Sequence, residues 1–567
     1  MNTFKPTQIA QGILENQLSG VNRTVKLSVV VEGKIISHYK HFRLKQSTRK
    51  HHEFELTLAH DVLGTAETYS LEEAHKFLGK RLTVVMAYKD MTDSPERTFV
   101  GVITGVGFSQ EKNSLGHLVL KGYSPTILLD SEPHTQSFGG NQSVNMSIIA
   151  NEIIKQGIDT SKYDVRVEAN DHTQITYSSQ YNETHYNYLN RMAVAYDEQF
   201  YYDGEVLHFG KLPQQNQPIK LVYGSNVHNI HIQLKAMHTQ TEFYGYNSSK
   251  HEKLSTGSTP IKHKSELAQT AYKQTDGVFK TPALQIAPLK ATTHLDVEYA
   301  QKSAAGNKGA EVLTVSGSSN IPFLYPGCVA DIEMRQADTN VTTYFTKLLM
   351  VDVLHEIDTR GHYTGSFEAI AADSGYLPQP EFTWPIAQQQ IATVVSNTDP
   401  LGQGRVQVRF DWQLNDTTEF IRMMAPDAGG TDQVNQNRGY VAIPEVGDQV
   451  MIGFVHNHPD RPFVMGGMFH GKVGLGGGAD NRVKSIMTRS GHKVIFSEDE
   501  SIVITDKSGN EIHLDTTGSN ITITAPETMT LNCKNMHRNV AENMSTSVGQ
   551  NQMTSIVLNQ TNTIGVN

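Results

Sequence analysis

Four histidines in two close pairs are the residues with the most obvious metal-binding chemistry in this chain. His456 and His458 are two positions apart in the loop HNHPDRP, and both imidazoles can reach one metal ion if that loop lies on the symmetry axis of an oligomer. His51 and His52 are adjacent, so on a strand they point to opposite faces. Loop histidines are more commonly solvated than coordinated. His456 and His458 are therefore weak metal candidates, and no cofactor is expected.

Motifs for hydrolysis and nucleotide binding are absent or incomplete. The chain has neither a His-Glu-x-x-His zinc motif nor a Gly-x-Ser-x-Gly nucleophile elbow. GQGRVQ at 402–407 lacks the third glycine of a dinucleotide loop, and GLGGGADN at 474–481 is not followed by Gly-Lys-Ser/Thr. We interpret these two segments as a turn and a flexible joint, and we predict that the protein is not an enzyme.

A third chemistry is suggested by basic residues near an aromatic one. Arg405, Arg409, Trp412 and Arg422 would suit a face that binds an oligonucleotide or a sugar. The alternative is that they pack a small barrel and form ion pairs between subunits. The net charge is −10, from 48 basic and 58 acidic residues, which favours this alternative and argues against nucleic acid as a partner.

Length and composition indicate a soluble protein of several domains. A chain of 567 residues is expected to hold three or four domains. Cys328 and Cys533 are its only cysteines, which excludes a disulfide framework and a cysteine-based zinc site. The N-terminus lacks the basic and apolar regions of a signal peptide, and no apolar run reaches the ~18 residues of a membrane span. We expect synthesis in the cytoplasm and any export to use another route.

The elements that must position these residues are mostly strands. Short β-branched segments bounded by polar turns predict barrels or sandwiches in residues 1–375, for example at 53–60, 81–88, 99–108 and 117–124. Helices are predicted at 70–79, 146–157 and 183–198. In the last of these, Tyr188, Met192 and Tyr196 share one face.

The second half of the chain divides into four further segments. Prolines and a glutamine run predict a linker at 376–391, followed by a compact β domain at 392–471 and a glycine-rich joint at 472–483. A β stalk is expected from 484 to 567. Its strands are predicted around 502–504, 512–514, 521–523 and 529–531.

The end of the stalk repeats every eight residues. The units VAEN, VGQN, IVLN and IGVN begin at 540, 548, 556 and 564, and larger side chains also occur half a unit earlier. A four-residue step keeps all these positions on one face of a strand, whereas on a helix it drifts by ~40° each time.

So short a unit cannot wind one chain around its own core. We therefore expect an intertwined oligomeric β-prism; a disordered tail is the alternative. The predicted core residues are Val540, Met544, Val548, Ile556 and Ile564. Gln552 and Gln560 occupy core-phase positions too, and the sequence leaves open whether they face inward.

The segment 392–471 has the pattern of a five-stranded OB-type barrel. Val406, Val408 and Phe410 alternate on one strand, and the alternation resumes at Val450 and Ile452. Gly466 and Gly467 are expected to allow a close backbone approach. The residues that define turns and corners here are Gly402, Gly404, Arg405, Pro444, Gly447, Asp448, Gly453, Pro459, Asp460, Arg461, Pro462 and Gly466.

Three motifs resemble the VgrG spike proteins of bacterial type VI secretion and related contractile phage-tail spikes. The first is the OB-type segment at 397–470. The second is QYNETHYNYLNRMAVAYDEQFYYDGEVLHFGK at 180–211, with Asn190-Arg191, and the third is DNRVKSIMTRSGHKVIF at 480–496. The resemblance covers nearly the whole chain. One departure is HNHPDRP at 456–462, where relatives usually have Gly-Asp before Pro-Asp-Arg-Pro.

This resemblance implies a mainly β homotrimer with three parts. A hub at 1–375, with two related β-barrels and a few helices, would cap an Hcp-like tube. The OB domains would form a collar, and a triple-stranded β-helix at 484–567 would form the needle. Sheath contraction would drive this spike out of the cytoplasm and briefly through a target membrane. Baseplate proteins, effectors or their adaptors, and a separate PAAR-like tip protein at the C-terminal end would be partners.

Two other functions remain open at this point. The spike could belong to a phage tail or an extracellular contractile injection system. A β-helical carbohydrate-binding adhesin is a different class of protein, but residues 497–567 contain no Phe, Tyr or Trp to stack on a sugar.

Overall fold

The computed structural model describes residues 23–60, 62, 74–110, 115–170, 174–213, 217–257, 260–474, 476–498 and 501–565. The chain forms two compact units, residues 1–468 and 469–567. Strands outnumber helices in the structure, as predicted. Of the helix expected at 70–79, residues 70–73 lie outside the described residues, and the described part contains one short 3-10 helix, His75–Phe77.

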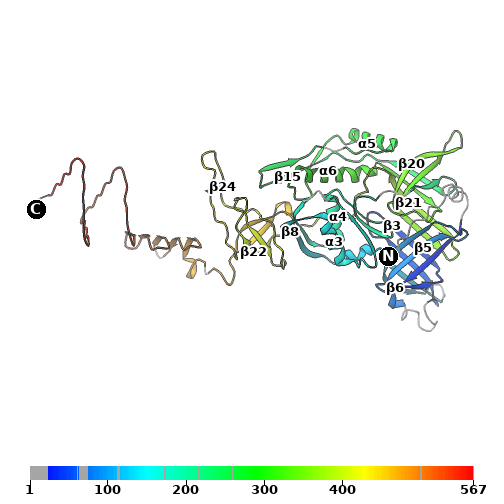
Figure 1. Ribbon diagram of the computed structural model, residues 1–567, viewed down its shortest axis with the longest axis horizontal. Coiled ribbons are helices and arrows are strands. Elements are labelled where there is room, and N and C mark those ends of the chain that lie inside the picture. The colour runs from blue at the N-terminus through cyan, green and yellow to red at the C-terminus, as the bar shows by residue number, and fades with distance from the viewer. Residues whose placement is uncertain are drawn as a thin grey trace. The chain divides into compact units, whose positions relative to one another are not determined.

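The largest element of the first unit is a sheet of 13 strands in the hub region (residues 23–375) (Figure 1). Its main path runs β14-β18-β21-β20-β3-β4-β7-β6-β5-β1-β2, and β19 joins both β20 and β13. The strands are β1 (Val25–Val31), β2 (Lys34–Ile36), β3 (His41–Ser47), β4 (Glu53–Ala59), β5 (Arg81–Tyr88), β6 (Glu96–Ser109), β7 (His117–Tyr123), β13 (Ile219–Val222), β14 (Val227–Leu234), β18 (Leu313–Ser319), β19 (Val329–Arg335), β20 (Thr342–Asp358) and β21 (Tyr363–Ala371).

Two groups of strands far apart in sequence meet in this sheet. Strands β1–β7 form one group, and β13, β14 and β18–β21 form the other. They join where β3 pairs antiparallel with β20, in a register that runs from His41↔Asp358 to Ser47↔Asp352. The four strands predicted in the first group are confirmed as β4, β5, β6 and β7.

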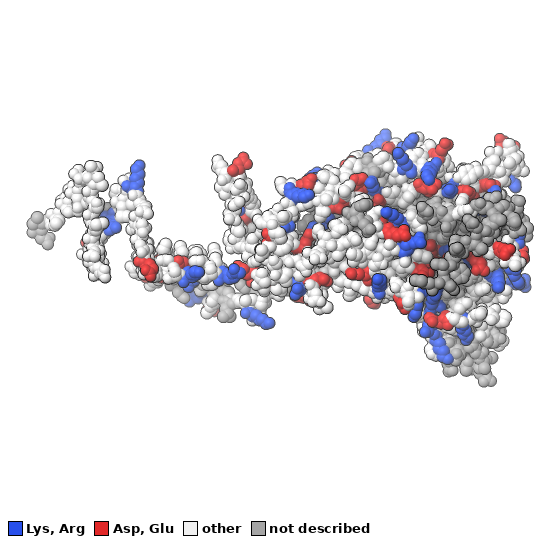
Figure 2. All heavy atoms as spheres, in the orientation of Figure 1, with Lys and Arg blue, Asp and Glu red and all other residues white. Residues whose placement is uncertain are grey.

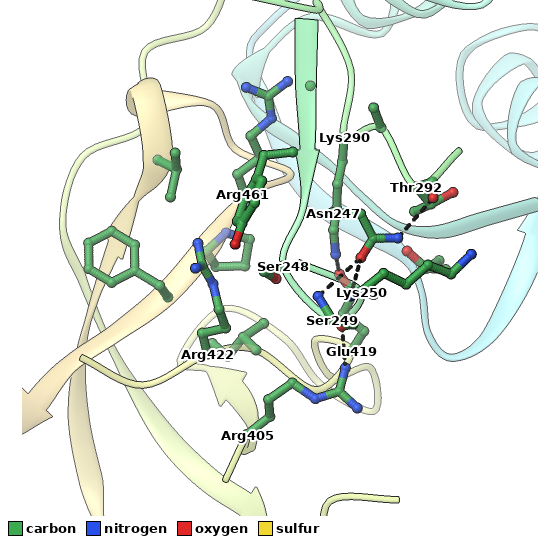
Figure 3. A pocket seen from close by; sticks show the side chains of 18 of the residues that line it. Asn247, Ser248, Ser249, Lys250, Lys290, Thr292, Arg405, Glu419, Arg422 and Arg461 are labelled. Atoms are coloured by element: carbon green, nitrogen blue, oxygen red, sulfur yellow. Dashed lines mark hydrogen bonds and ion pairs between the residues drawn. The ribbon is translucent and has the colours of Figure 1, made fainter. Parts of the chain in front are cut away.

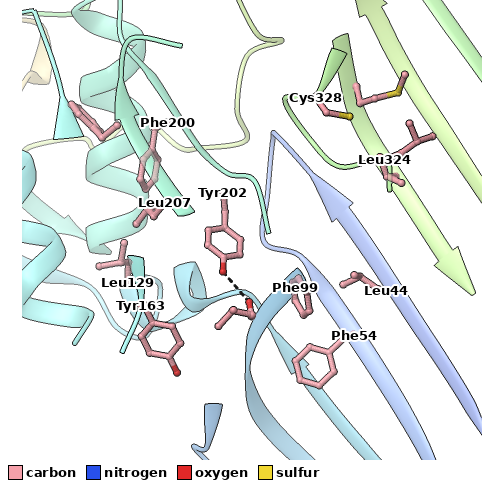
Figure 4. Close-up of a cluster of buried hydrophobic side chains, with 14 of the residues drawn as sticks. Leu44, Phe54, Phe99, Leu129, Tyr163, Phe200, Tyr202, Leu207, Leu324 and Cys328 are labelled. Atoms are coloured by element: carbon pink, nitrogen blue, oxygen red, sulfur yellow. Dashed lines mark hydrogen bonds between the residues drawn. The ribbon is translucent and has the colours of Figure 1, made fainter. Parts of the chain in front are cut away.

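Alternation along the strands explains how the sheet buries its core. Every second residue of β5 is buried, from Leu82 to Tyr88, because successive side chains point to opposite faces. Figure 4 shows the interior, where Phe54 and Phe99 meet edge to face with ring centroids 5.9 Å apart. The Tyr202 hydroxyl donates a 3.0 Å hydrogen bond to the Val100 carbonyl, which satisfies this buried polar group.

Among the described residues, the hub region also contains three small sheets and four α-helices. The sheets are β8 (His134–Asn145) with β10 (Gln174–Glu183); β9 (Asp164–Glu168), β11 (Gln199–Tyr202) and β12 (Val206–Gly210); and β15 (Thr241–Asn247), β16 (Glu252–Ser255) and β17 (Ala283–Ile286). The helices are α3 (Met146–Gly157), α4 (His185–Ala195), α5 (Glu266–Val278) and α6 (His294–Gly309).

Helices α3 and α4 confirm two sequence predictions. The Asn145 side chain caps α3 by accepting the Ile148 N–H at 3.0 Å, and Thr184 caps α4. Tyr188, Met192 and Tyr196 are buried together, as their spacing indicated. Helices α5 and α6 were not predicted. The buried side of α6 is partly polar, with Gln301, Ser303 and Asn307 in the interior, so it gives no apolar period.

The OB domain (residues 390–468) also belongs to the first unit. Its sheet has the order β23-β22-β26-β27, and β24 and β25 form a separate hairpin. Val406, Val408, Phe410, Val450 and Ile452 are all at most 1% exposed, which confirms the predicted alternation. The strands are β22 (Gln390–Ser396), β23 (Gln407–Phe410), β24 (Ala428–Gly429), β25 (Arg438–Gly439), β26 (Gln449–Phe454) and β27 (Pro462–Gly467).

The second unit contains one antiparallel meander of five strands. They are β28 (Val483–Met487), β29 (Lys493–Ser497), β30 (Ser501–Thr505), β31 (Glu511–Asp515) and β32 (Asn520–Thr524). Three of the four strands predicted by residue number are therefore present. No strand is assigned to 525–565, so the expected strand at 529–531 is not found in the single chain.

The octad residues lie in this strand-free segment. Val540, Met544, Val548, Ile556 and Ile564 are between 46% and 86% exposed. A strand needs a hydrogen-bonded neighbour, and the prediction placed that neighbour in other copies of the chain. The intertwined prism thus stays a prediction.

The visible surface does not carry a broad basic face. Figure 2 shows Lys and Arg interspersed with Asp and Glu over the hub region. Among the helices that the structure describes, none is both long and apolar enough to cross a bilayer.

Candidate functional site

Two of the sequence motifs meet in a buried cluster of charges. We call this cluster the joint; it is separate from the glycine-rich segment at 472–483. It consists of Glu183, Arg191 and Asp460, together with Ser178 and Ser179. The first two charged residues belong to the hub motif and Asp460 belongs to the corner between β26 and β27. The joint therefore ties the hub region to the OB domain inside one unit.

Helix α4 places Arg191 at the centre of the joint. Its side chain is 1% exposed, and its guanidinium binds Glu183 at 2.7 Å and the Ser179 carbonyl at 3.0 Å. Burial lowers the pKa of Arg191, but the carboxylates of Glu183 and Asp460 outweigh this and raise it. Arg191 is therefore held as a cation, because a buried charge is tolerated only when it is paired and hydrogen-bonded.

Asp460 enters the joint from the OB domain. Its carboxylate accepts the Ser179 N–H at 2.7 Å and the Ser178 hydroxyl at 3.4 Å, and lies 3.9 Å from the Arg191 guanidinium. Burial raises the pKa of this carboxyl, and the neighbouring Arg191 opposes that shift. The sequence predicted only a rigid corner here, and the structure shows that the corner inserts an acid into the hub.

The residues on either side of Asp460 bind hub backbone atoms. His458 Nε2 lies 3.1 Å from the Pro288 carbonyl, and its Nδ1 accepts the Asp460 N–H at 3.2 Å. Arg461 donates to the carbonyls of Ala287 and Leu289. Burial, with help from nearby arginines, holds the pKa of His458 well below its usual range. The imidazole is therefore neutral, which agrees with one donating and one accepting nitrogen.

The contacts of His458 decide whether His456 and His458 are arranged to bind a metal ion together. Both ring nitrogens of His458 are already engaged, so the pair 456/458 is not arranged as a ligand set in this chain. Within the described ranges, no group of three or more His, Cys, Asp or Glu side chains is placed to hold a metal ion. His51 binds Thr126 and Asp130, and His52 binds Gln46 and the Ser47 carbonyl.

The loop that departs from the family pattern has an unusual backbone. His456 and Asn457 both have φ near +57°, in the left-handed region. Asparagine and histidine are enriched there among residues other than glycine, so the sequence suits this turn. The Asn457 carbonyl accepts the Ala387 N–H at 2.9 Å, which fastens the loop to the connecting segment (residues 376–389).

The connecting segment is itself anchored to the hub. Asn187 on α4 accepts the Thr383 N–H at 2.8 Å and donates to the Thr383 carbonyl at 2.8 Å. Leu377 and Ala387 are buried. These contacts hold the connecting segment against the rest of the first unit.

Most of the predicted turn residues of the OB domain lie at turns. Gly402, Gly404 and Gly447 have positive φ. Asp448 accepts the Glu445 N–H at 2.9 Å, and the Pro444 carbonyl accepts Asn397 Nδ2 at 3.1 Å. The prediction of a close approach at Gly466 and Gly467 is wrong within this chain, because an added Cβ meets nothing within 4 Å there. Close approach occurs instead at Gly453, where an added Cβ would meet the Phe463 ring at 2.8 Å.

The four residues considered for nucleic acid or sugar binding do not form one face. Trp412 stacks on Phe410 with ring planes 7° apart and donates to Gln390. Arg409 binds the Asp416 carbonyl. Arg405 and Arg422 instead line a cavity between the hub region and the OB domain, shown in Figure 3.

Sequence reasoning missed the partners in the joint and the cavity. Glu183 and Arg191 are only eight residues apart, but Glu183 ends β10 before the Thr184 cap, so helical i,i+4 spacing does not pair them. Ser179, Pro288, Lys290 and Glu419 carry no recognisable signal, because they contribute backbone groups or a single charge to a partner more than a hundred residues away.

Comparison with known proteins supports the resemblance that the sequence motifs indicated. Residues 390–469 match the family model described as the type VI secretion system/phage-baseplate injector OB domain. The chain is 24% identical over 445 residues to the type VI secretion system spike protein VgrG5 of Pseudomonas aeruginosa, covering 69% of this chain and 53% of the relative. It thus spans about half the length of that curated relative.

Two solved structures share the fold. One is an E. coli component of the type VI secretion system with structural similarity to the T4 phage tail proteins gp27 and gp5; it has 14% identity, a TM-score of 0.50, and coverage of 78% of this chain and 99% of that chain. The other is a chain of the half-lidded Francisella PdpA–VgrG complex, with 7% identity, a TM-score of 0.54 and 88% coverage of both chains. The resemblance indicated by the motifs is confirmed: this chain is similar in sequence to VgrG spike proteins of type VI secretion and in fold to that system's spike and phage-tail hub proteins.

Proposed function

We propose that this protein is a homotrimeric spike that caps the Hcp-like tube of a type VI secretion system and is driven into target cells by sheath contraction. The hub region would sit on the tube, the OB domains would form a collar, and residues 484–567 would form the needle. The likeness to VgrG5 in sequence supports the spike function, and the likeness to the E. coli protein supports the hub and OB fold.

One observation carries the proposal of several copies, namely an apolar face on the five-stranded meander. Directly paired residues share a face, and the registers align Ile486, Val494, Ile504, Ile512 and Ile523 in one row. A second row on the same face begins with Lys484 and continues with Phe496, Ile502, Leu514 and Ile521.

The opposite face of the meander is more polar. It carries Ser485, Ile495, Val503, His513 and Thr522. Ile486, Phe496, Ile512 and Ile523 on the apolar face are between 40% and 58% exposed. Apolar rows of this length are normally covered, and the meander and octads of further copies are the proposed cover.

The role is mechanical rather than catalytic. A needle under load needs many hydrogen bonds between chains and no open sheet edge, and an intertwined prism supplies both. The buried joint would pass force from the hub to the collar through paired charges and backbone contacts. Effectors or their adaptors, baseplate proteins and a PAAR-like tip protein would be the partners, and the spike would leave the cell with the expelled tube.

Co-purification from the source bacterium tests this function. A tagged full chain is expected to bring down a tube protein and a small tip protein, and to appear in the medium only when the sheath can contract. A chain that is recovered without tube protein, or that reaches the medium equally without a sheath, would contradict it. Recovery with phage tail proteins would instead support the phage-tail spike, which the fold likeness also favours.

A further inference from the structure

The cavity between the hub region and the OB domain has a volume of about 610 Å³ and lies within the first unit. Its walls come from four parts of the chain: Thr176 and residues within 244–250 and 286–292 of the hub region, and scattered residues of the OB domain between 401 and 463. Volumes of roughly 300–1,000 Å³ are typical of small-molecule sites. The feature is therefore large enough for a ligand.

Cations dominate the charged residues of this cavity. Five line it, namely Lys250, Lys290, Arg405, Arg422 and Arg461, against one acid, Glu419. In Figure 3, Arg405, Arg422 and Arg461 come from the OB domain, and Lys250 and Lys290 come from the hub region. The surplus contrasts with the net charge of −10 of the whole chain.

Two of these cations are neutralised inside the protein. Lys290 forms an ion pair with Glu419. Arg405 binds Asp399 with Nη2–Oδ1 at 2.7 Å and Nε–Oδ2 at 3.0 Å. This fork-to-fork pair fixes the Arg405 guanidinium in place.

The other three cations have no carboxylate partner within 4.0 Å among the described residues. Arg461 donates to the carbonyls of Ala287 and Leu289, and the Asp460 carboxylate, which attracts it through space, is directed to Ser179 and Arg191. Arg422 lies over the Tyr246 ring, 5.8 Å from its centroid. Lys250 and Arg422 thus bring positive charges with no carboxylate within 4.0 Å among the described residues, and the attraction of Asp460 does not offset the burial of Arg461.

The pKa of Lys290 is affected by the same positive charges. Burial lowers the pKa of its ammonium to about 8; the Asp460 carboxylate opposes this shift, and the positive charges of Arg405, Arg461 and Arg422 add to it. The repulsion between partly enclosed cations is stronger than in water because the surrounding dielectric is low. A bound anion would relieve this repulsion.

We propose that this cavity is a binding site for a small polyanion that carries two or three oxyanion groups, phosphate or carboxylate. Guanidinium forks match the planar edges of both groups. Arg422 and Lys250 supply the free charge at the mouth, and Arg461 supplies it deeper in the wall. The ligand would bridge the hub region and the OB domain and so stiffen the joint.

Isothermal titration of the full chain, in a phosphate-free buffer of low ionic strength, tests the site. The probes are pyrophosphate for the phosphate source, citrate for the carboxylate source, and sucrose as the uncharged control. We expect one of the two anions to bind once per chain and sucrose not to bind. Tighter binding of pyrophosphate identifies a phosphate ligand, and tighter binding of citrate identifies a carboxylate ligand.

Variants localise the binding. Arg422→Gln and Lys250→Gln remove charges that hold no other part of the fold by an ion pair, and each should weaken the anion by about tenfold. Arg409→Gln is the matched control, because Arg409 is on the same domain but outside the cavity, and it should leave the affinity unchanged. Absence of binding by both anions, or equal affinity in wild type, Arg422→Gln and Lys250→Gln, would overturn the proposal.

Discussion

The two units of this chain treat their apolar and charged groups differently. In the first unit, the strands bury their apolar residues against the same chain, and the charged residues at the joint pair with one another. In the second unit, the meander presents two apolar rows on one face, and residues such as Ile512 remain 40% exposed. The first unit has the properties of a self-sufficient fold, and the second has those of a fold shared between copies.

This difference separates two sources of stability. Mutations inside the first unit should change the unfolding of each chain without changing how copies associate. Mutations on the apolar face of the second unit should change association and leave the first unit folded. Both tryptophans, Trp384 and Trp412, lie in the first unit, so tryptophan fluorescence reports on that unit alone.

The largest effect is expected at the apolar face. Ile512→Asp removes about 2 kcal/mol of apolar burial per copy and adds a charge, so three copies lose about 6 kcal/mol of association free energy. His513→Asp is the control, because His513 lies on the opposite face of the same strand. Sedimentation velocity should show dissociation of the first variant at concentrations where the second is intact. Equal behaviour of the two would break the comparison.

The next largest effect is expected at the joint. Asp460→Ala leaves Arg191 with one buried carboxylate and the Ser179 N–H without its acceptor, which should cost about 3–5 kcal/mol. Urea unfolding followed by tryptophan fluorescence measures this loss. Asp432→Ala, at an exposed position of the OB domain, should change nothing. A loss below about 1 kcal/mol for Asp460→Ala would show that the joint does not stabilise the first unit.

A smaller effect separates two glycines of the OB sheet. In Gly453→Ala the new Cβ would meet the Phe463 ring at 2.8 Å and the Met465 sulfur at 3.0 Å, so we expect destabilisation of about 1–3 kcal/mol. Gly466→Ala meets no atom within 4 Å and should be nearly neutral in a single chain. If Gly466→Ala is the worse variant and also weakens association, another copy packs against β27.

The smallest effect depends on pH. Burial raises the pKa of the Asp197 carboxyl to about 7, whereas the unfolded chain releases this proton near pH 4. The folded state therefore binds more protons between these values, and its free energy of unfolding decreases as the pH rises from about 4 to 7.

Asp197→Asn tests that dependence. It should be more stable than wild type by about 1 kcal/mol at pH 8 and show no gain at pH 4. Asparagine also tolerates the positive φ of this position, which is 63°. Thermal unfolding at the two pH values measures the difference, and an equal change at both would contradict the assignment to Asp197.

Local patterns in the sequence predicted much of the fold. Alternating β-branched residues located β4 to β7, and the cap residues Asn145 and Thr184 mark the starts of α3 and α4. Helix α6 escaped prediction because its buried side includes Gln301 and Asn307. The strand at 529–531 was predicted from the same alternation, but pairing decides whether such a residue run becomes a strand.

The joint shows what one sequence does not contain. Asn190-Arg191 and Pro459-Asp460 were each identified in separate motifs, yet nothing in either motif says that Arg191 and Asp460 meet across 269 positions. Neighbouring residues set the local turn, whereas the ion pair depends on how the hub strands and the OB domain pack. The cavity has the same origin, because its cations come from both sides.

Sedimentation equilibrium of the full chain at micromolar concentration, compared with a chain ending at residue 483, tests the central claim most directly. The claim is that the C-terminal meander and octads hold copies of the spike together. We predict a mass of about three times 62.9 kDa for the full chain and a weaker association after truncation, with the tryptophan fluorescence of the first unit unchanged. A full chain that sediments at 62.9 kDa, or a truncated chain that associates equally well, would contradict the account.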